Sequence, residues 1–301
     1  MLPICTNING IDNNSVFYNK KEKTQKKTTY TKPLLKFNNN KEKFDEIVPK
    51  YYTVDFGSIK RKNYVYDYTK KPLDIDKEIG ATKQRKMNCW LLTGINAVAS
   101  TKKGKEYIKN AIAYHDDKKT VVHLAGNNIT VTIPQMVLSA VKQSKTYVNG
   151  DDDMLALELA TEYYKKMLIV NKNDINNPNP NFITGKYTSG NVNNPTAGGN
   201  SSDIMFLLTG KRSKTIFNGK YTVPKKLKNA LIQKQKSPDT CALTCNFRSE
   251  EDGLITHHAY AIKKIDNKFV TLINPHNSGK EEKVTLKDFC KNVKSLTVLD
   301  L

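Results

Sequence analysis

The sequence is poor in the residues that build disulfide-rich or zinc-binding proteins. Its 301 residues include five cysteines, five histidines and one tryptophan. The cysteines form no CxxC pair, and three residues separate Cys241 from Cys245. We therefore expect neither a disulfide framework nor a zinc site, and the pattern is typical of a chain that folds in a reducing compartment.

Long hydrophobic runs are also missing. No stretch approaches the roughly 18 apolar residues that a membrane-spanning helix needs. The first residues, MLPICTNINGIDNNSVFYNK, lack the basic start and apolar core of a secretory signal. We expect a cytoplasmic protein without a membrane span, although export without a cleaved signal stays open. The oligomeric state is not fixed by the sequence, and a monomer is the simpler expectation.

Acidic residues are outnumbered: 49 Lys and Arg face 29 Asp and Glu, which gives a net charge of +20. The basic clusters, such as KKEKTQKK at 20–27 and KRK at 60–62, contain few of the aromatic side chains that stack on bases. Lysine-rich surfaces are commonly just solvated. We expect no specific nucleic-acid partner and at most a mild preference for acidic substrates or anionic surfaces.

Composition divides the chain into four parts. Residues 1–48 are rich in Asn, Lys and Thr and predict a disordered tail. Residues 49–79 predict an extended lead-in arm, 80–200 a mainly helical subdomain, and 201–301 a β-rich subdomain. Helices precede strands, which is typical of an α+β fold rather than of alternating βαβ units.

Within these parts the apolar spacing predicts individual elements. The helices are expected at 89–99, 104–113, 152–168, 203–210 and 223–236. TVVHLAG and ITVTI (129–133) predict a hairpin, and residues 171–202, dense in Asn, Pro and Gly, predict a loop. TCALTCNF, HHAYAIKKI and FVTLINP predict strands, followed by a last helix or strand pair in LKDFCKNVKSLTVLDL.

Cys89, within QRKMNCWLL, stands directly before a helical apolar pattern. The N–H groups at a helix N-terminus favour a negative charge, so a cysteine there can act as a nucleophile. The alternative is a buried structural thiol, and spacing alone does not decide between the two.

A nucleophilic cysteine needs a base and a group that orients the base. His257, His258 and His276 lie within twenty residues of one another, and neighbours on a strand face opposite sides. If the 258–265 strand turns at 266–268 into the next one, His258 lies opposite His276, with Asn274 diagonal to it. A two-residue loop would turn Asn274 to the other face. Asn274 can hold an imidazole as in papain-like enzymes, or be an ordinary turn residue before Pro275.

Gln84 lies five residues before Cys89. Its side-chain N–H can stabilise a developing oxyanion. Taken alone, it is as compatible with a solvated loop residue.

Taken in order, these motifs resemble the calpain family of cysteine proteases. CWLL at 89–92, ALELATEYYKKM at 156–167, GGNSSDIMFLLTG at 198–210, HAYAI at 258–262, NP at 274–275 and the LTVLDL ending are each similar to a segment of its protease core. The resemblance covers about 80–301. It implies a papain-like fold with the active-site cleft between a helical and a β-rich subdomain.

Carried over by position, the resemblance makes Cys89 the nucleophile, His258 the general base and acid, Asn274 the orienting residue and Gln84 the oxyanion donor. A protein or peptide would be the substrate, and no cofactor or metal is implied. The family places its glutamine six residues before the cysteine, where this chain has Lys83, and a tryptophan after NP, where this chain has His276. Residues 79–105 contain no Asp or Glu, so we expect no calcium requirement.

Two other functions stay open. The same three side chains serve any acyl transfer, so the protein could deamidate or modify another protein as an effector. The charge of +20 and the shifted Gln84 are also compatible with an inactive, basic binding module.

Overall fold

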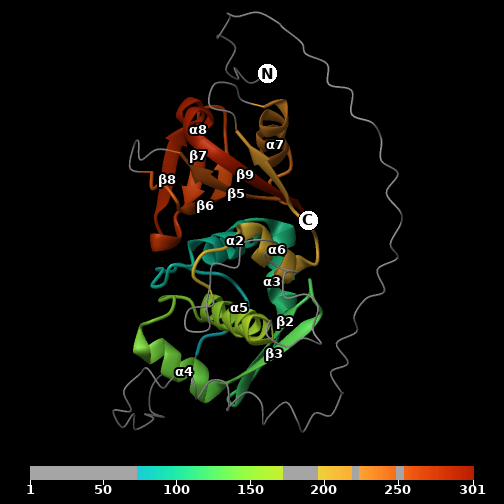
Figure 1. Ribbon diagram of the computed structural model, residues 1–301, viewed down its shortest axis with the longest axis vertical. Coiled ribbons are helices and arrows are strands. Elements are labelled where there is room, and N and C mark those ends of the chain that lie inside the picture. The colour runs from blue at the N-terminus through green and yellow to red at the C-terminus, as the bar shows by residue number, and fades with distance from the viewer. Residues whose placement is uncertain (1–72, 172–195, 219–223, 249–253) are drawn as a thin grey trace, which may run out of the picture.

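The computed structural model describes residues 73–171, 196–218, 224–248 and 254–301. The predicted tail at 1–48, the lead-in arm up to residue 72 and most of the predicted 171–202 loop lie outside the described residues. Residues 73–80 form no helix or strand. The chain is an α+β protein with two antiparallel sheets (Figure 1).

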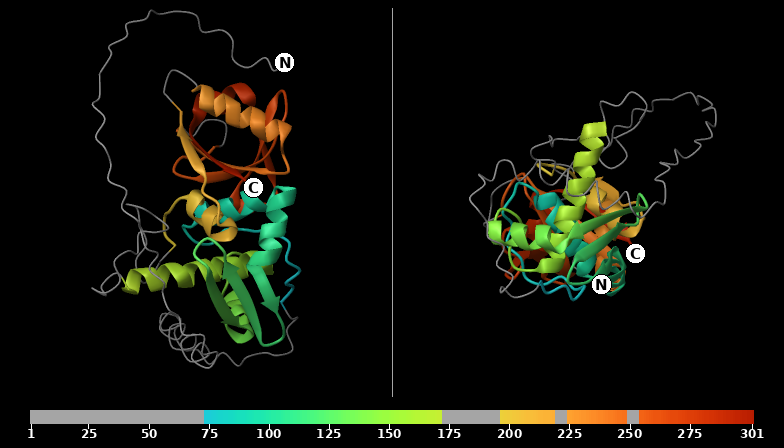
Figure 2. Two further views of the ribbon diagram at one scale, coloured as in Figure 1. Left: turned by 90° about the vertical axis from the view of Figure 1, so that its right-hand side faces the viewer. Right: turned by 90° about the horizontal axis from the view of Figure 1, so that it is seen from below.

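The N-terminal part of the described chain combines helices with a small sheet. Its elements are α2 (Cys89–Ala99), α3 (Lys102–Ala111), β1 (Ile112–His115), β2 (Lys119–Leu124), β3 (Ile129–Pro134), α4 (Gln135–Ser144), α5 (Asp152–Asn171) and α6 (Ser201–Thr209). The strands form a three-stranded sheet in the order β1-β2-β3. Figure 2 shows this sheet and α5 at the opposite end of the molecule from the helix α7 described next.

The C-terminal part is built on a larger sheet. Its elements are β4 (Lys214–Phe217), α7 (Lys225–Lys236), β5 (Cys241–Phe247), β6 (Ala259–Ile265), β7 (Phe269–Ile273), the 3-10 helix η4 (Pro275–Asn277), β8 (Glu281–Thr285), α8 (Leu286–Asn292) and β9 (Val293–Asp300). The six strands lie in the order β4-β9-β5-β6-β7-β8, and all neighbours are antiparallel.

Two hydrophobic clusters form the core, one on each face of the six-stranded sheet. The first joins the helices to sheet residues such as Ala242, Ala261 and Leu299, and the second packs α7 and α8 against the other face. Helix α2 lies between the large sheet and α5, because it contacts β5, β6 and α5 (Figure 1). Apolar side chains of α6 also belong to the first cluster. The helical part of the chain therefore continues past residue 200, where the sequence predicted that it would end.

Most expected elements are confirmed, with shifted ends. The helix predicted at 89–99 has these bounds, and the hairpin of β2 and β3 pairs as expected. The helix expected at 104–113 instead spans Lys102–Ala111, because the side chain of Thr101 caps its N-terminus by accepting from the N–H of Gly104. The last segment contains both a helix, α8, and a strand, β9.

The β6–β7 hairpin turns differently from the expected three-residue turn. The N–H of Asp266 donates to Phe269 O at 3.0 Å, so the loop has two residues, and Ile265 pairs with Val270. A bulge between Ile262 and Lys264 then shifts the register by one, and Ala261 pairs with Ile273. The two shifts cancel, and the expected register near His258 is restored.

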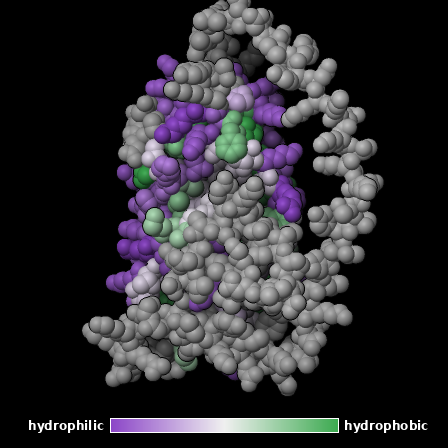
Figure 3. Space-filling model, in the orientation of Figure 1, coloured by the Kyte–Doolittle hydropathy of each residue, from purple (hydrophilic) through white to green (hydrophobic). Residues whose placement is uncertain are grey.

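The visible described surface is mostly hydrophilic (Figure 3). Large apolar side chains are exposed at only a few described positions, namely Met87, Tyr114, Met136, Phe217 and Phe269. Among the helices in the described part of the chain, none combines the length and apolar character needed to cross a membrane.

Candidate active site

Cys89 is the first residue of helix α2 and is partly exposed. Helix α2 is anchored on the large sheet, because the hydroxyl of Thr93 donates to Ala259 O at 2.8 Å. It is anchored on α6 as well, where a Cβ at Gly94 would lie 2.2 Å from Ile204 Cγ2. The start of α2 is therefore held between the two parts of the molecule, next to the start of β6.

Opposing effects act on the pKa of the Cys89 thiol. Burial raises its pKa, and hydrogen bonds from the N–H groups of Ala259, Trp90 and Cys89 itself lower it, with burial the larger effect. The thiol is therefore protonated at neutral pH until a base takes the proton. The contact with the N–H of Ala259 brings the sulfur to the residue that follows His258 in the chain.

His258 and Asn274 are hydrogen-bonded to each other, His258 Nε2 to Asn274 Oδ1, at 2.8 Å. Both side chains are buried, whereas His257 is exposed and adopts a left-handed backbone conformation. The structure thus brings together the base and the orienting residue expected from the sequence. Because a carbonyl oxygen only accepts, Nε2 carries the proton and Nδ1 is left as the basic nitrogen.

Glu282, on β8, determines which way the Asn274 amide points. Asn274 Nδ2 donates to Glu282 Oε1 at 2.9 Å, and an ionised carboxylate can only accept. Asn274 Oδ1 is then turned to His258, and it also accepts from the N–H of His276 at 3.0 Å. Glu282 was not expected from the sequence, since its place beside Asn274 depends on the β7–β8 pairing.

The ring of His258 lies among other rings. The centroid of His276 is 4.2 Å away in a tilted arrangement, and that of Tyr260 is 5.0 Å away, edge-on. Burial lowers the pKa of His258 to about 4; the bond to Asn274 opposes this shift and the charge of His276 adds to it. His258 is therefore a neutral imidazole at pH 7, the form that accepts a proton.

Gln84 lies in the same region but bonds within its own loop. Its backbone N–H donates to Pro275 O at 3.0 Å, which places it beside the residue after Asn274. Its side-chain Nε2 donates to Lys86 O, while Oε1 is buried and has no hydrogen-bond partner among the described residues. One side-chain N–H of Gln84 is thus already used, and the second remains.

The loop before Cys89 is held by carboxylates of α5, which the sequence did not single out. Asn88 Nδ2 donates to Glu158 Oε1 at 2.6 Å, and the N–H of Val148 donates to Glu158 Oε2 at 2.8 Å. Burial raises the pKa of Glu158 to about 7. One turn along α5, Glu162 pairs with Lys86 at 2.7 Å.

The other cysteines of the described chain are buried. Burial raises the pKa of Cys241 to about 11 and raises that of Cys245 as well. Cys241, Cys245 and Cys290 are all buried free thiols, whereas Cys89 is partly exposed. Among the cysteines of the described residues, Cys89 is therefore the one most open to a labelling reagent. In the described ranges there is also no group of three His, Cys, Asp or Glu placed to hold a metal ion.

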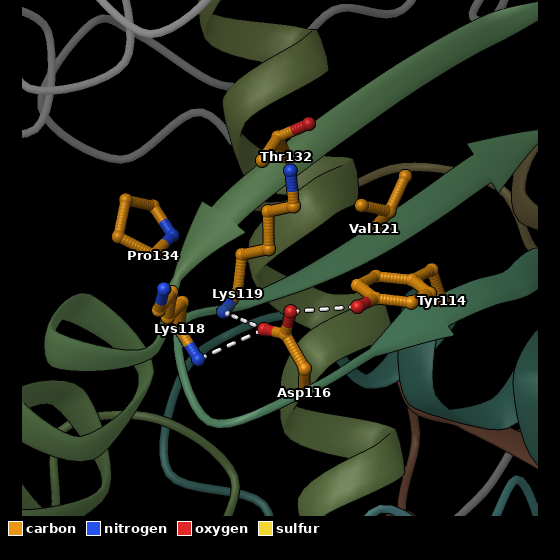
Figure 4. A pocket seen from close by; sticks show the side chains of 7 residues that line it. All are labelled: Tyr114, Asp116, Lys118, Lys119, Val121, Thr132 and Pro134. Atoms are coloured by element: carbon orange, nitrogen blue, oxygen red, sulfur yellow. Dashed lines mark hydrogen bonds between the residues drawn. The ribbon is translucent and has the colours of Figure 1, made fainter.

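A surface pocket of about 650 Å³ lies elsewhere, on the three-stranded sheet (Figure 4). Its acidic residue, Asp116, accepts from the hydroxyl of Tyr114 and from the N–H groups of Lys118 and Lys119. These bonds shape the β1–β2 turn. No residue of the Cys89, His258 and Asn274 group lines this pocket.

Comparison with known proteins supplies no independent assignment. No protein-family model matches the chain, and the comparison with curated proteins finds no significant match.

Proposed function

We propose that the protein is a cysteine endopeptidase with a papain-like fold, similar to the calpain protease core, that acts through Cys89, His258 and Asn274. The observation that supports this most is the hydrogen bond from His258 Nε2 to Asn274 Oδ1 at 2.8 Å, beside the helix that begins at Cys89. A core thiol needs no oriented imidazole nearby, whereas a nucleophile does.

The reaction begins when His258 Nδ1 takes the proton of the Cys89 thiol as the sulfur attacks a peptide carbonyl. The developing oxyanion is stabilised by the N–H of Cys89 and by the remaining side-chain N–H of Gln84. The imidazolium returns its proton to the leaving amine nitrogen, the C–N bond breaks, and a thioester remains on Cys89. Water then attacks the thioester, with its proton going to His258, and the carboxylic acid product leaves as the thiol reforms.

The charges of the two groups favour a neutral resting pair. Burial lowers the pKa of His258 to about 4 and raises that of Cys89, so at pH 7 the imidazole is neutral and the cysteine is a thiol. Activity is then expected to fall when the pH drops toward the range in which His258 becomes charged.

The direct test compares the purified protein with its Cys89→Ala variant on an unfolded protein substrate and on the chain itself. We expect cleavage by the wild-type protein and none by the variant. Equal cleavage by both would overturn the proposal.

Deamidation or another acyl transfer on a protein is the second candidate, since the same three groups would serve it. Intact-mass measurement of a substrate protein separates the two, because proteolysis breaks the chain and deamidation changes its mass by about one dalton while leaving it whole. An inactive binding module would be favoured if an epoxysuccinyl inhibitor failed to label Cys89 in preference to the buried cysteines.

A further inference from the structure

The N-terminus of α2 lacks the side-chain cap that its sequence offers. Asn is among the best N-cap residues, because its Oδ1 can accept from the second or third N–H of the helix. Asn88 occupies the N-cap position of α2 but makes no such bond. Its side chain is instead turned to Glu158, and its Oδ1 is buried with no hydrogen-bond partner among the described residues.

The uncapped N–H groups are the ones next to the sulfur. Leu91 and Leu92 both donate to Asn88 O. Burial raises the pKa of the Cys89 thiol, and the nearby backbone N–H groups of Ala259, Trp90 and Cys89 itself oppose that shift. If Asn88 rotated to cap the helix in the usual way, its Oδ1 would compete with the sulfur for the N–H of Trp90.

We propose that Glu158 is a positioning residue that holds the Asn88 side chain away from the helix end and so reserves the first N–H groups of α2 for the Cys89 sulfur and the reacting oxyanion. Glu158 is suited to this because it is fully buried on the rigid helix α5 and is itself fixed by the N–H of Val148. The part concerning the oxyanion rests on the proposed function. The part concerning the thiol does not.

The consequence is a link between a buried carboxylate and thiol reactivity. With Glu158 removed, Asn88 Oδ1 is free to take the N–H of Trp90, and the thiolate of Cys89 loses a donor. Losing one hydrogen bond to a charged group costs about a factor of ten in the thiolate population at neutral pH.

The test measures the rate at which iodoacetamide alkylates Cys89, as a function of pH, in the full chain. We expect Glu158→Ala to raise the pKa of the thiol and to slow alkylation at pH 7 by about tenfold. The double variant Asn88→Ala/Glu158→Ala has no side chain left to cap the helix, and its rate should return to within about threefold of wild type. Glu158→Gln still binds the Asn88 amide and should also stay near wild type.

Glu162→Ala is the matched control, because Glu162 lies one turn further along α5 and pairs with Lys86 rather than Asn88. Asn88→Ser provides an independent route should Glu158→Ala fail to fold. The serine hydroxyl is too short to reach Glu158 and can accept from the N–H of Trp90, so this variant should slow alkylation in the same way.

An unchanged thiol pKa in Glu158→Ala, or a double variant as slow as Glu158→Ala, would overturn the inference. So would an equal slowing by Glu162→Ala, which would indicate a general loosening of the loop. If no variant and not even the wild-type protein cleaves peptides, the proposed function fails, while the alkylation series still decides the role of Glu158.

Discussion

The ring of His276 contacts the ring of His258, and its charge disfavours a proton there. In His276→Phe the ring contact is kept and the charge is removed, so the pKa of His258 should rise. In the proposed mechanism the neutral imidazole is the base, so the acid limb of the pH profile of kcat/KM should move to higher pH. The profile of the wild-type protein, measured with the same peptide, is the reference; a limb that stays in place would show that His276 does not affect His258 electrostatically.

Glu282 holds Asn274 in the orientation that His258 needs. In Glu282→Ala the amide of Asn274 can flip and present N–H groups to Nε2, which disfavours the tautomer with a basic Nδ1. We expect kcat to fall by about tenfold or more with little change in KM. Glu281→Ala is the matched control, because Glu281 is exposed on the same strand and pairs with Lys263. Equal effects of the two substitutions would argue against an orienting role.

Gln84 has one side-chain N–H directed to Lys86 O and one remaining. If the second serves the oxyanion, Gln84→Ala should lower kcat by about 10²-fold, the usual cost of losing such a donor. Gln84→Glu has nearly the same shape but no N–H and should lose as much. A loss of less than about fivefold in both would assign Gln84 to the loop alone.

At the residue scale, the sequence indicated where the candidate cysteine and histidine lie but not which side chains hydrogen-bond to the residues around them. A cysteine before a helical pattern and a histidine at the start of a later strand were visible in the order of residues. Glu158 and Glu282 were not, because each acts through a contact between segments whose packing the sequence does not specify. The sequence likewise does not reveal that the Asn88 side chain leaves the end of α2 uncapped, since this depends on its hydrogen bond to the buried Glu158.

At the scale of elements, the contact between α2 and α6 depends on Gly94. Replacing a helical glycine by alanine normally stabilises a helix by up to about 1 kcal/mol. At Gly94 the added Cβ would meet Ile204 Cγ2 at 2.2 Å and Ser201 O at 3.0 Å, and overpacking of a core costs about 1–3 kcal/mol. The cost of overpacking should exceed the gain in helix propensity, so Gly94→Ala is expected to lower the free energy of unfolding in a denaturant titration. An increase would mean that α6 moves away at little cost.

Helices and strands were largely predictable because their apolar periods are strong. Their ends were less so, as α3 shows, since a cap such as Thr101 depends on a local hydrogen bond. The register of the hairpin near His258 agrees with the expected one, although the sequence did not reveal why. The turn is one residue shorter than expected, and the bulge in β6 shifts the pairing back by one residue.

At the scale of the whole molecule, buried carboxyl groups make the stability depend on pH. Burial raises the pKa of Asp203 to about 7 from 3.8, and its Oδ2 has no hydrogen-bond partner among the described residues. Between these pH values the folded chain keeps a proton that the unfolded chain releases. The free energy of unfolding should therefore fall as the pH rises from about 4 to 7, through this group.

In Asp203→Asn this fall should be smaller, as measured by urea titrations at several pH values in that range. Asp116→Asn is the control, because hydrogen bonds from Tyr114 and from backbone N–H groups lower the pKa of Asp116, so the pH dependence of stability that this group causes lies below that range. A pH dependence identical to that of wild type in Asp203→Asn would show that the carboxyl group is already ionised in the folded chain.

The bulge at the middle of β6 also separates the turn of the β6–β7 hairpin from the part of the hairpin next to His258. The turn at residues 266–269 lies on the far side of the bulge from His258, and the strands between bulge and histidine keep their own register. A change in the length or conformation of the turn can thus be accommodated at the bulge without moving the imidazole of His258. Grafting a peptide epitope or a fluorophore site between Asn267 and Lys268 would place a reporter on the hairpin while leaving the strand pairing near His258 intact.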